Sequence, residues 1–172
     1  IPRAGMVVKT NTPKLRKYRK MILELLLANH CRDCTTCHMS GKCRLQEFAY
    51  KFNIENVRFP NTACTLSPDR SSYCILRDPG KCILCGKCVS VCAKLQGCSA
   101  ITKINRGFET KVGTSFDRCM QESSCVGCGQ CVLVCPTGAL TQKNDLTQVL
   151  DILEKKDVIK IAQVAPAVRV SI

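Results

Sequence analysis

Sixteen cysteines among 172 residues, and above all their spacing, constrain this chain more than any other feature. One run, followed directly by Pro136, reads Cys125-x2-Cys128-x2-Cys131-x3-Cys135. Three cysteines spaced in this way can fold round one cubane of iron and sulfide, while the fourth is directed toward a second cluster. A second run is therefore expected. It is present, with Ala93 in place of the proline, as Cys82-x2-Cys85-x2-Cys88-x3-Cys92.

The crossed pattern of two-cluster ferredoxins takes the ligands of each cluster from both runs. It predicts one 4Fe-4S cluster at site 2, held by Cys82, Cys85, Cys88 and Cys135, and another at site 3, held by Cys92, Cys125, Cys128 and Cys131. Structural zinc would use two separated CxxC pairs that close one tetrahedral site. Disulfide frameworks belong to short secreted chains. Two complete runs argue against both alternatives.

A third site, site 1, is predicted upstream from His30, Cys34, Cys37 and Cys43. Cys31 would complete an all-cysteine set with the same three thiolates, so the residues alone leave the fourth ligand open. A histidine ligand would make the cluster less negative and raise its reduction potential. His38 is interpreted as a helix cap. The remaining cysteines lack a recognisable spacing and are interpreted as small buried side chains: Cys31, Cys64, Cys74, Cys98 and Cys119.

The formal charge of +13 assumes protonated cysteines. Ligating thiolates are deprotonated, and three clusters would remove about five units of positive charge. The remaining charge suits docking to an acidic redox partner, while the lack of aromatic residues among the basic ones argues against nucleic acid. No apolar run approaches the ~18 residues of a membrane span, and no signal-peptide pattern precedes the helix. We therefore expect a cytoplasmic protein whose thiols are free to bind metal.

The predicted fold class is α+β, a small His/Cys3 module followed by a ferredoxin-like domain with a hairpin insertion. Thr12 and Pro13 start a helix over residues 13–28, whose apolar stripe is Leu15, Tyr18, Met21, Ile22, Leu25 and Leu26. Residues 59–80 read as a surface linker. Strands at 100–104 and 108–112 form a hairpin, Asp145 caps a short helix, and residues 158–164 read as a strand.

The residues from His30 to Cys43, followed by Arg44-Leu45-Gln46, resemble a module shared by FeFe-hydrogenases, the large iron-sulfur subunit of respiratory complex I, and cytosolic formate dehydrogenases. Residues 78–88 resemble the ferredoxin-like module that comes next in these families. Their module uses the histidine as a ligand, so the resemblance favours His30 over Cys31. Complex I subunits carry a single, differently spaced cluster afterwards, which disfavours that branch.

Residues 161–170 resemble the opening strand of the FeFe-hydrogenase catalytic domain, whereas formate dehydrogenases continue into a molybdopterin domain. The resemblance implies four segments: the tail of a missing N-terminal domain at 1–12, the His/Cys3 module at 13–77, the two-cluster domain at 78–143, and a connector with the first catalytic-domain strand at 144–172. The H-cluster and an additional 2Fe-2S cluster are expected outside these residues, and no catalytic residue is expected within them.

This resemblance implies an electron relay through three 4Fe-4S clusters in an FeFe-hydrogenase subunit, an oxidoreductase that acts reversibly on hydrogen. The expected partners are the other domains of the same subunit and either ferredoxin or NAD(P)H-oxidising flavin and iron-sulfur subunits. Two alternatives stay open. One is the equivalent arm of a formate dehydrogenase, and the other is a free-standing polyferredoxin.

Overall fold

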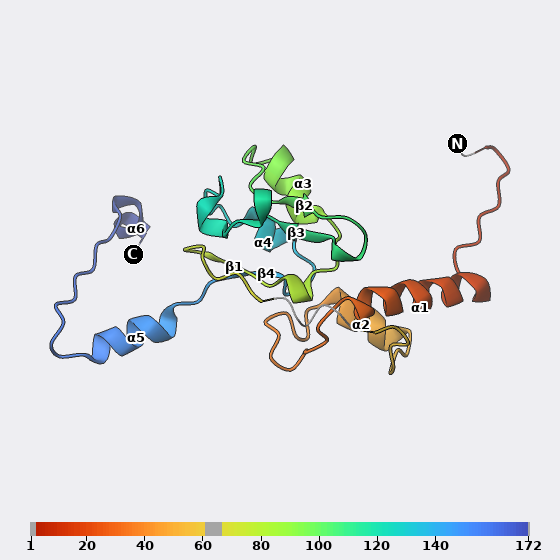
Figure 1. Ribbon diagram of the computed structural model, residues 1–172, viewed down its shortest axis with the longest axis horizontal. Coiled ribbons are helices and arrows are strands. Elements are labelled where there is room, and N and C mark those ends of the chain that lie inside the picture. The colour runs from red at the N-terminus through yellow and green to blue at the C-terminus, as the bar shows by residue number, and fades with distance from the viewer. Residues whose placement is uncertain (1–2, 61–66, 172) are drawn as a thin grey trace.

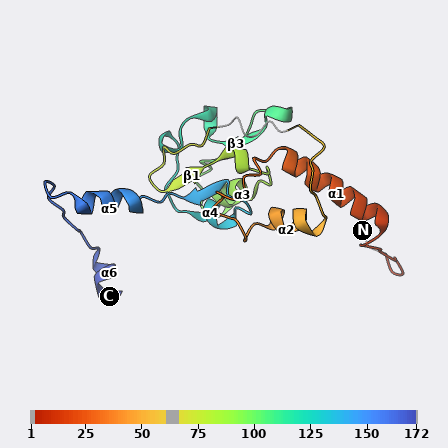
Figure 2. The ribbon, with the colours of Figure 1, turned by 90° about the horizontal axis from the view of Figure 1, so that it is seen from below.

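The computed structural model describes residues 3–60 and 67–171. Two short antiparallel sheets and helices α3 and α4 form its centre, with α1 and α2 on one side and α5 and α6 along an arm on the other (Figures 1 and 2). α1 and α6 therefore lie at opposite ends of the molecule. Short 3-10 turns lie at Pro79–Lys81, Gly107–Glu109, Ser115–Asp117 and Met120–Glu122.

Helix α1 (Pro13–Ala28) has the predicted bounds. The Thr12 side chain accepts a hydrogen bond from the Leu15 amide at 3.3 Å, and Pro13 occupies the first turn, where no amide partner is needed. Most of the predicted apolar stripe is solvent-exposed, because α1 turns Glu24 and Leu27 inward instead. Glu24 is paired with Arg58 at 2.6 Å. Helix α2 (Arg44–Lys51) begins directly after Cys43 and packs on α1.

Strand β1 (Ile75–Arg77) pairs antiparallel with β4 (Leu140–Gln142), with Arg77 opposite Leu140. The prediction of a linker over residues 59–80 is thus wrong at residues 75–77, because alternating side chains of this stretch are buried and its backbone pairs with β4. Residues 61–66 of that predicted linker, including Cys64, lie outside the described residues.

The predicted hairpin is confirmed, although its strands are shorter than expected. β2 (Thr102–Ile104) pairs antiparallel with β3 (Lys111–Gly113), so that Lys103 lies opposite Val112. The connection bends through Asn105, whose φ is +60°. Asparagine tolerates this left-handed conformation better than most residues. The hairpin places Val112 in the core.

Helices α3 (Lys87–Lys94) and α4 (Gln130–Val134) carry the second halves of the two cysteine runs and pack against each other. Each begins after a left-handed glycine, Gly86 with φ +74° and Gly129 with φ +73°. The core around them combines apolar residues with two buried cysteines: Ile75, Val91, Ile101, Val112, Met120, Leu140, Cys88 and Cys131.

Helix α5 (Leu146–Glu154) follows Asp145 as predicted, but the Asn144 side chain, not that of Asp145, accepts the Leu146 amide. The strand predicted at residues 158–164 is wrong. This stretch is exposed and has no paired strand among the described residues, and an isolated strand leaves its amides and carbonyls without partners. Pro166 then starts α6 (Pro166–Ser171).

In the part of the chain that the structure describes, no helix is long and apolar enough to cross a membrane.

Candidate metal centres

Site 2 is a pocket lined by all four cysteines of its predicted set, Cys82, Cys85, Cys88 and Cys135. Its other walls are mostly apolar and include Ile83, Val112, Pro136 and Leu140. Soft thiolates in an apolar shell are the donors that iron-sulfur clusters prefer. These residues therefore fit a 4Fe-4S cluster.

Site 3 is a pocket lined by the other predicted set, Cys92, Cys125, Cys128 and Cys131. Its apolar walls include Ile75, Ile101 and Met120. The crossing of the two runs arises within the helices. α3 carries Cys88 for site 2 and Cys92 for site 3, four residues apart and hence on one face. Cys131 and Cys135 cross in the opposite sense, at the start and just beyond the end of α4.

Backbone amides point at the thiols of both sites in the same pattern. The Leu84 amide donates to the Cys82 sulfur at 3.4 Å, and the Gly127 amide holds the equivalent position beside Cys125. Such bonds stabilise the charged form of sulfur and tune a bound cluster. Leu84 and Gly127 both need a positive φ for this, +56° and +67°.

Burial acts against ionisation of the deepest thiols. It raises the pKa of Cys88 to about 12 and that of Cys131 to about 11. It also raises the pKa of Cys82 and Cys125. At neutral pH these thiols are protonated, so ligation displaces protons and depends on the positive charge of iron. Among residues 3–60 and 67–171, no three His, Cys, Asp or Glu side chains are grouped so as to hold a single metal ion.

At site 1 the structure brings Cys31, Cys34, Cys37 and Cys43 into one neighbourhood. Burial raises the pKa of Cys34, and the other three cysteines add to the shift. His30 is buried beside them, and its Nδ1 accepts the Arg32 amide at 3.0 Å. Burial lowers the pKa of His30, which favours the neutral imidazole that a metal requires. Both His30 and Cys31 remain candidates for the fourth ligand.

Site 1 lies against the wall of site 2. A Cβ atom on Gly138 would be 2.8 Å from the Cys37 sulfur, so the loop after Cys135 passes directly beside this cysteine. The Cys31 amide donates to the Gly80 carbonyl at 2.9 Å, and the Thr137 hydroxyl to the Lys81 carbonyl at 2.7 Å. The sites are therefore arranged in the order 1, 2, 3.

The cysteines outside the three predicted sets differ in their surroundings. Cys98 lines the pocket of site 3, and the Cys74 sulfur lies 3.6 Å from the Gly127 carbonyl. Cys119 is exposed, contrary to the prediction that it is buried. No spacing signal in the sequence placed Cys74 or Cys98 beside site 3.

His38 is exposed and lies in a turn between α1 and α2, so the prediction that it caps a helix is wrong.

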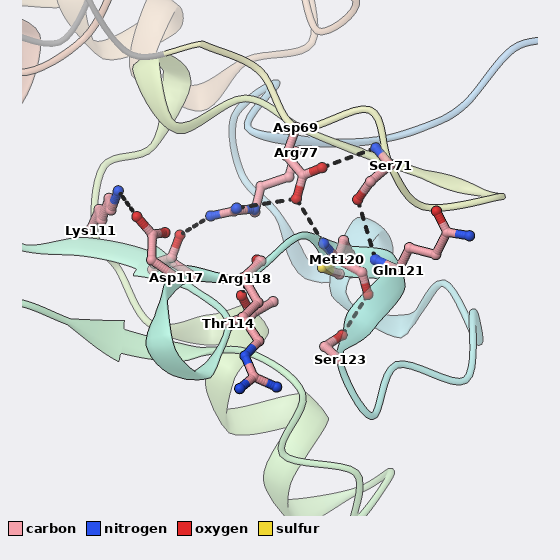
Figure 3. Close-up of polar contacts among 11 residues, drawn as sticks. Asp69, Ser71, Arg77, Lys111, Thr114, Asp117, Arg118, Met120, Gln121 and Ser123 are labelled. Carbon is pink, nitrogen blue, oxygen red and sulfur yellow. Dashed lines mark hydrogen bonds and ion pairs between the residues drawn. The ribbon is translucent and has the colours of Figure 1, made fainter.

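Arg77, which borders site 2, belongs to a polar network (Figure 3). The residues of this network have no recognisable spacing in the sequence, so the network was not predicted. The Arg77 guanidinium is paired with Asp69 at 3.2 Å and donates to the Val112 carbonyl at 3.0 Å. Asp69 also accepts the amides of Ser71 at 2.9 Å and Met120 at 3.0 Å. The network ties β1 to the hairpin and to the segment that leads into the second cysteine run.

Two family models match the chain in the regions of these sites. Residues 19–58 match the iron-sulfur binding region of NADH-ubiquinone oxidoreductase-G, and residues 81–139 match a 4Fe-4S dicluster domain. The chain binds 4Fe-4S clusters and transfers electrons. The α+β class, with an iron-sulfur module of the NADH-ubiquinone oxidoreductase-G type before the dicluster domain, is confirmed.

Known proteins with similar sequences are subunits of larger oxidoreductases. The NADP-reducing hydrogenase subunit HndD of Solidesulfovibrio fructosivorans is 39% identical over 98% of this chain. An NADH-quinone oxidoreductase subunit of Rhizobium meliloti is 38% identical over 79% of it. The chain spans 29% and 16% of these two relatives. A solved structure of an NAD+-reducing [NiFe]-hydrogenase superposes with a TM-score of 0.75 and 28% identity, covering 83% of this chain and 61% of that one.

Proposed function

We propose that this chain relays single electrons through three clusters in an FeFe-hydrogenase subunit that couples hydrogen to ferredoxin or NAD(P)H. The main support for an electron relay is the pair of pockets. Each pocket is lined by three cysteines of one run and one cysteine of the other run. The hydrogenase assignment is supported by the relative HndD, whose similarity extends over 98% of the chain, compared with 79% for the NADH-quinone oxidoreductase relative.

In this proposal the ligands are the predicted ones: His30, Cys34, Cys37 and Cys43 at site 1, the Cys82 set at site 2, and the Cys125 set at site 3. Each cluster supplies a site that gains and loses one electron. The protein's own residues exclude water, direct amides at sulfur, and keep neighbouring sites in contact. α3 links sites 2 and 3 within about one helical turn, and the Cys37–Gly138 contact links sites 1 and 2.

The proposed assembly follows from the same reasoning. Residues 13–77 and 78–143 are the two cluster-binding segments, and residues 1–12 and 144–172 lead from and into further domains of a cytoplasmic subunit. The electron partner is ferredoxin or an NAD(P)H-oxidising flavin and iron-sulfur subunit. This fits relatives whose names include an NADP-reducing hydrogenase and an NADPH-Fe(3+) oxidoreductase of Geobacter sulfurreducens.

The test uses the full-length gene product, purified anaerobically with its partner subunits. We expect hydrogen to reduce ferredoxin or NADP+, and formate to do neither. Cys37→Ser should abolish this transfer, whereas Cys119→Ser, which changes an exposed cysteine outside the predicted ligand sets, should leave it intact. Reduction with formate in place of hydrogen would instead establish the formate dehydrogenase alternative.

Metal analysis tests the relay separately from the enzyme class. Three 4Fe-4S clusters require about twelve irons and as many sulfides in these residues. A yield near four irons, or a colourless folded protein that contains zinc, would contradict the three sites.

Replacing His30 by Ala should alter one EPR signal of the reduced protein. The same result from Cys31→Ala, with His30→Ala silent, would show that Cys31 is the ligand.

A further inference from the structure

We propose that Arg77 holds a fixed positive charge beside site 2 and thereby raises the reduction potential of the cluster there. This inference rests on the proposed ligand sets. It adds a bias to the relay, because the charge favours the reduced state of site 2.

The first observation is the placement of strand β1 along both sites. Ile75 and Arg77 share one face of the strand, about 7 Å apart, since side chains alternate along a strand. Ile75 is part of the site 3 pocket and Arg77 part of the site 2 pocket. One strand thus presents an apolar side chain to one site and a cation to the other.

The second observation is that the guanidinium is held by two hydrogen bonds and has one nitrogen without a partner among the described residues. Arg77 is only 8% exposed, and its two terminal nitrogens are bonded to Asp69 and the Val112 carbonyl. Its buried Nε has no hydrogen-bond partner among the described residues. Buried N–H groups almost always have an acceptor. The guanidinium is thus held by its two terminal nitrogens at the border of the site 2 pocket.

The third observation is the charge around the two pockets. Site 3 has no charged side chain among its described lining residues. At site 2 the lining includes Asp78 as well as Arg77, and Asp78 is paired with Lys81 at 3.1 Å. Lys103 reaches the Gly86 loop from the hairpin, and its charge also acts on Cys82, but its side chain is exposed, so solvent weakens this charge. Among the described residues that line site 2, Arg77 is the buried cation.

The sign of the effect follows from electrostatics. Reduction adds one negative charge to a cluster that its thiolates already make negative. A cation fixed in a low-dielectric environment stabilises this added charge more than it would in water. Asp69 offsets part of the effect, so removing either partner of the pair should shift the potential of site 2, in opposite directions.

The experiment is an EPR-monitored redox titration of the purified protein with its clusters, and site 2 is identified as the signal that Cys85→Ser alters. In Arg77→Met we expect the reduced-to-oxidised ratio of site 2 to fall about tenfold at a given potential, which is about 59 mV for a one-electron couple. Arg77→Lys should keep most of the wild-type value. Lys111→Met removes the same charge from the more exposed pair with Asp117 and should change the ratio by less than about twofold.

Asp69→Asn provides an independent arm with the opposite sign, which a loss of structure would not produce. It should raise the ratio at site 2, and it decides the proposal if Arg77→Met does not fold. The proposal is overturned if site 2 does not move in fully loaded variants, or if site 3 moves instead. A wild-type protein with fewer than about twelve irons would overturn the ligand sets as well.

Discussion

Sites 2 and 3 are built from two copies of one cysteine pattern, yet their surroundings differ in three respects. Both have a left-handed glycine before the helix and the same amide contacts to sulfur. The first difference lies on strand β1, which places Arg77 at site 2 and Ile75 at site 3. The comparison shows that the repeated spacing arranges the ligands, whereas residues outside the spacing determine the charge and shape around them.

The second difference follows the fourth cysteine of each run. Pro136 lacks an amide and disfavours a helical conformation at the residue before it. Accordingly α4 ends at Val134 after five residues, and Cys135 is extended. Ala93 imposes no such limit, so α3 continues through Cys92 to Lys94 for eight residues. Cys92 therefore reaches its site from within a helix and Cys135 from beyond one.

The third difference concerns the loop between the first two cysteines of each run. Leu84 adopts a left-handed conformation that costs a non-glycine residue roughly 1–2 kcal/mol. Gly127 adopts it without that cost, and it is closely approached by another thiol. A Cβ atom on Gly127 would lie 2.9 Å from the Cys74 sulfur. The two loops have the same backbone but are not interchangeable.

The largest expected effect comes from breaking the crossed ligand pattern. Cys92→Ser should alter the same EPR signal as Cys128→Ser, and Cys135→Ser the same signal as Cys85→Ser, since each pair shares a pocket. Each change should remove or convert one cluster, up to about four irons. If Cys92→Ser and Cys85→Ser alter one common signal, each run binds its own cluster and the crossed pattern is wrong.

The next largest effect is expected from Ala93→Pro, which imposes the sequence of the second run on the first. Proline inside α3 removes an amide and should cost about 3 kcal/mol or more. Because α3 carries Cys92, site 3 should lose its cluster before site 2 does. Thermal unfolding and iron content measure the two effects. Pro136→Ala is the matched control and should change both much less, because Cys135 already lies beyond α4.

A reciprocal exchange tests the two loops. Gly127→Leu should destabilise the protein by about 2 kcal/mol or more, because it adds left-handed strain and drives a side chain into the Cys74 sulfur. Leu84→Gly should change the stability by less than about 1 kcal/mol, since relief of strain offsets the flexibility of glycine. Chemical unfolding of the loaded protein measures both. Equal effects in the two variants would contradict the asymmetry.

The smallest effect concerns the contact of site 1 with site 2. Gly138→Ala should push Cys37 aside and destabilise the protein by about 1 kcal/mol. The EPR signals of sites 1 and 2 should shift slightly, whereas that of site 3 should not. Gly97→Ala provides a control for the loss of a glycine away from sites 1 and 2, because no atom lies within 4 Å of the added carbon, although its φ of +70° adds some strain. A shift confined to site 3 would contradict the order of the sites.

Much of the architecture could be predicted from local patterns. Helix α1 is specified by Thr12, Pro13 and a run of helix-forming residues, and the hairpin by the turn at Asn105. The two wrong predictions about strands share one cause. Whether residues 75–77 and 158–164 form strands depends on a partner distant in the chain, and only the first stretch finds one, β4, among the described residues. The buried face of α1 was likewise decided by its tertiary contacts, among them the pairing of Glu24 with Arg58.

The sequence by itself determined the cluster chemistry, because the spacing of the cysteines limits which sulfurs can surround one cubane. It also determined the unequal lengths of α3 and α4 through Ala93 and Pro136. Only the tertiary structure decided that Arg77 borders site 2 and Ile75 site 3, and that Cys37 contacts Gly138. These placements arise from the packing of segments far apart in the chain, and such packing leaves no periodic signal in the sequence.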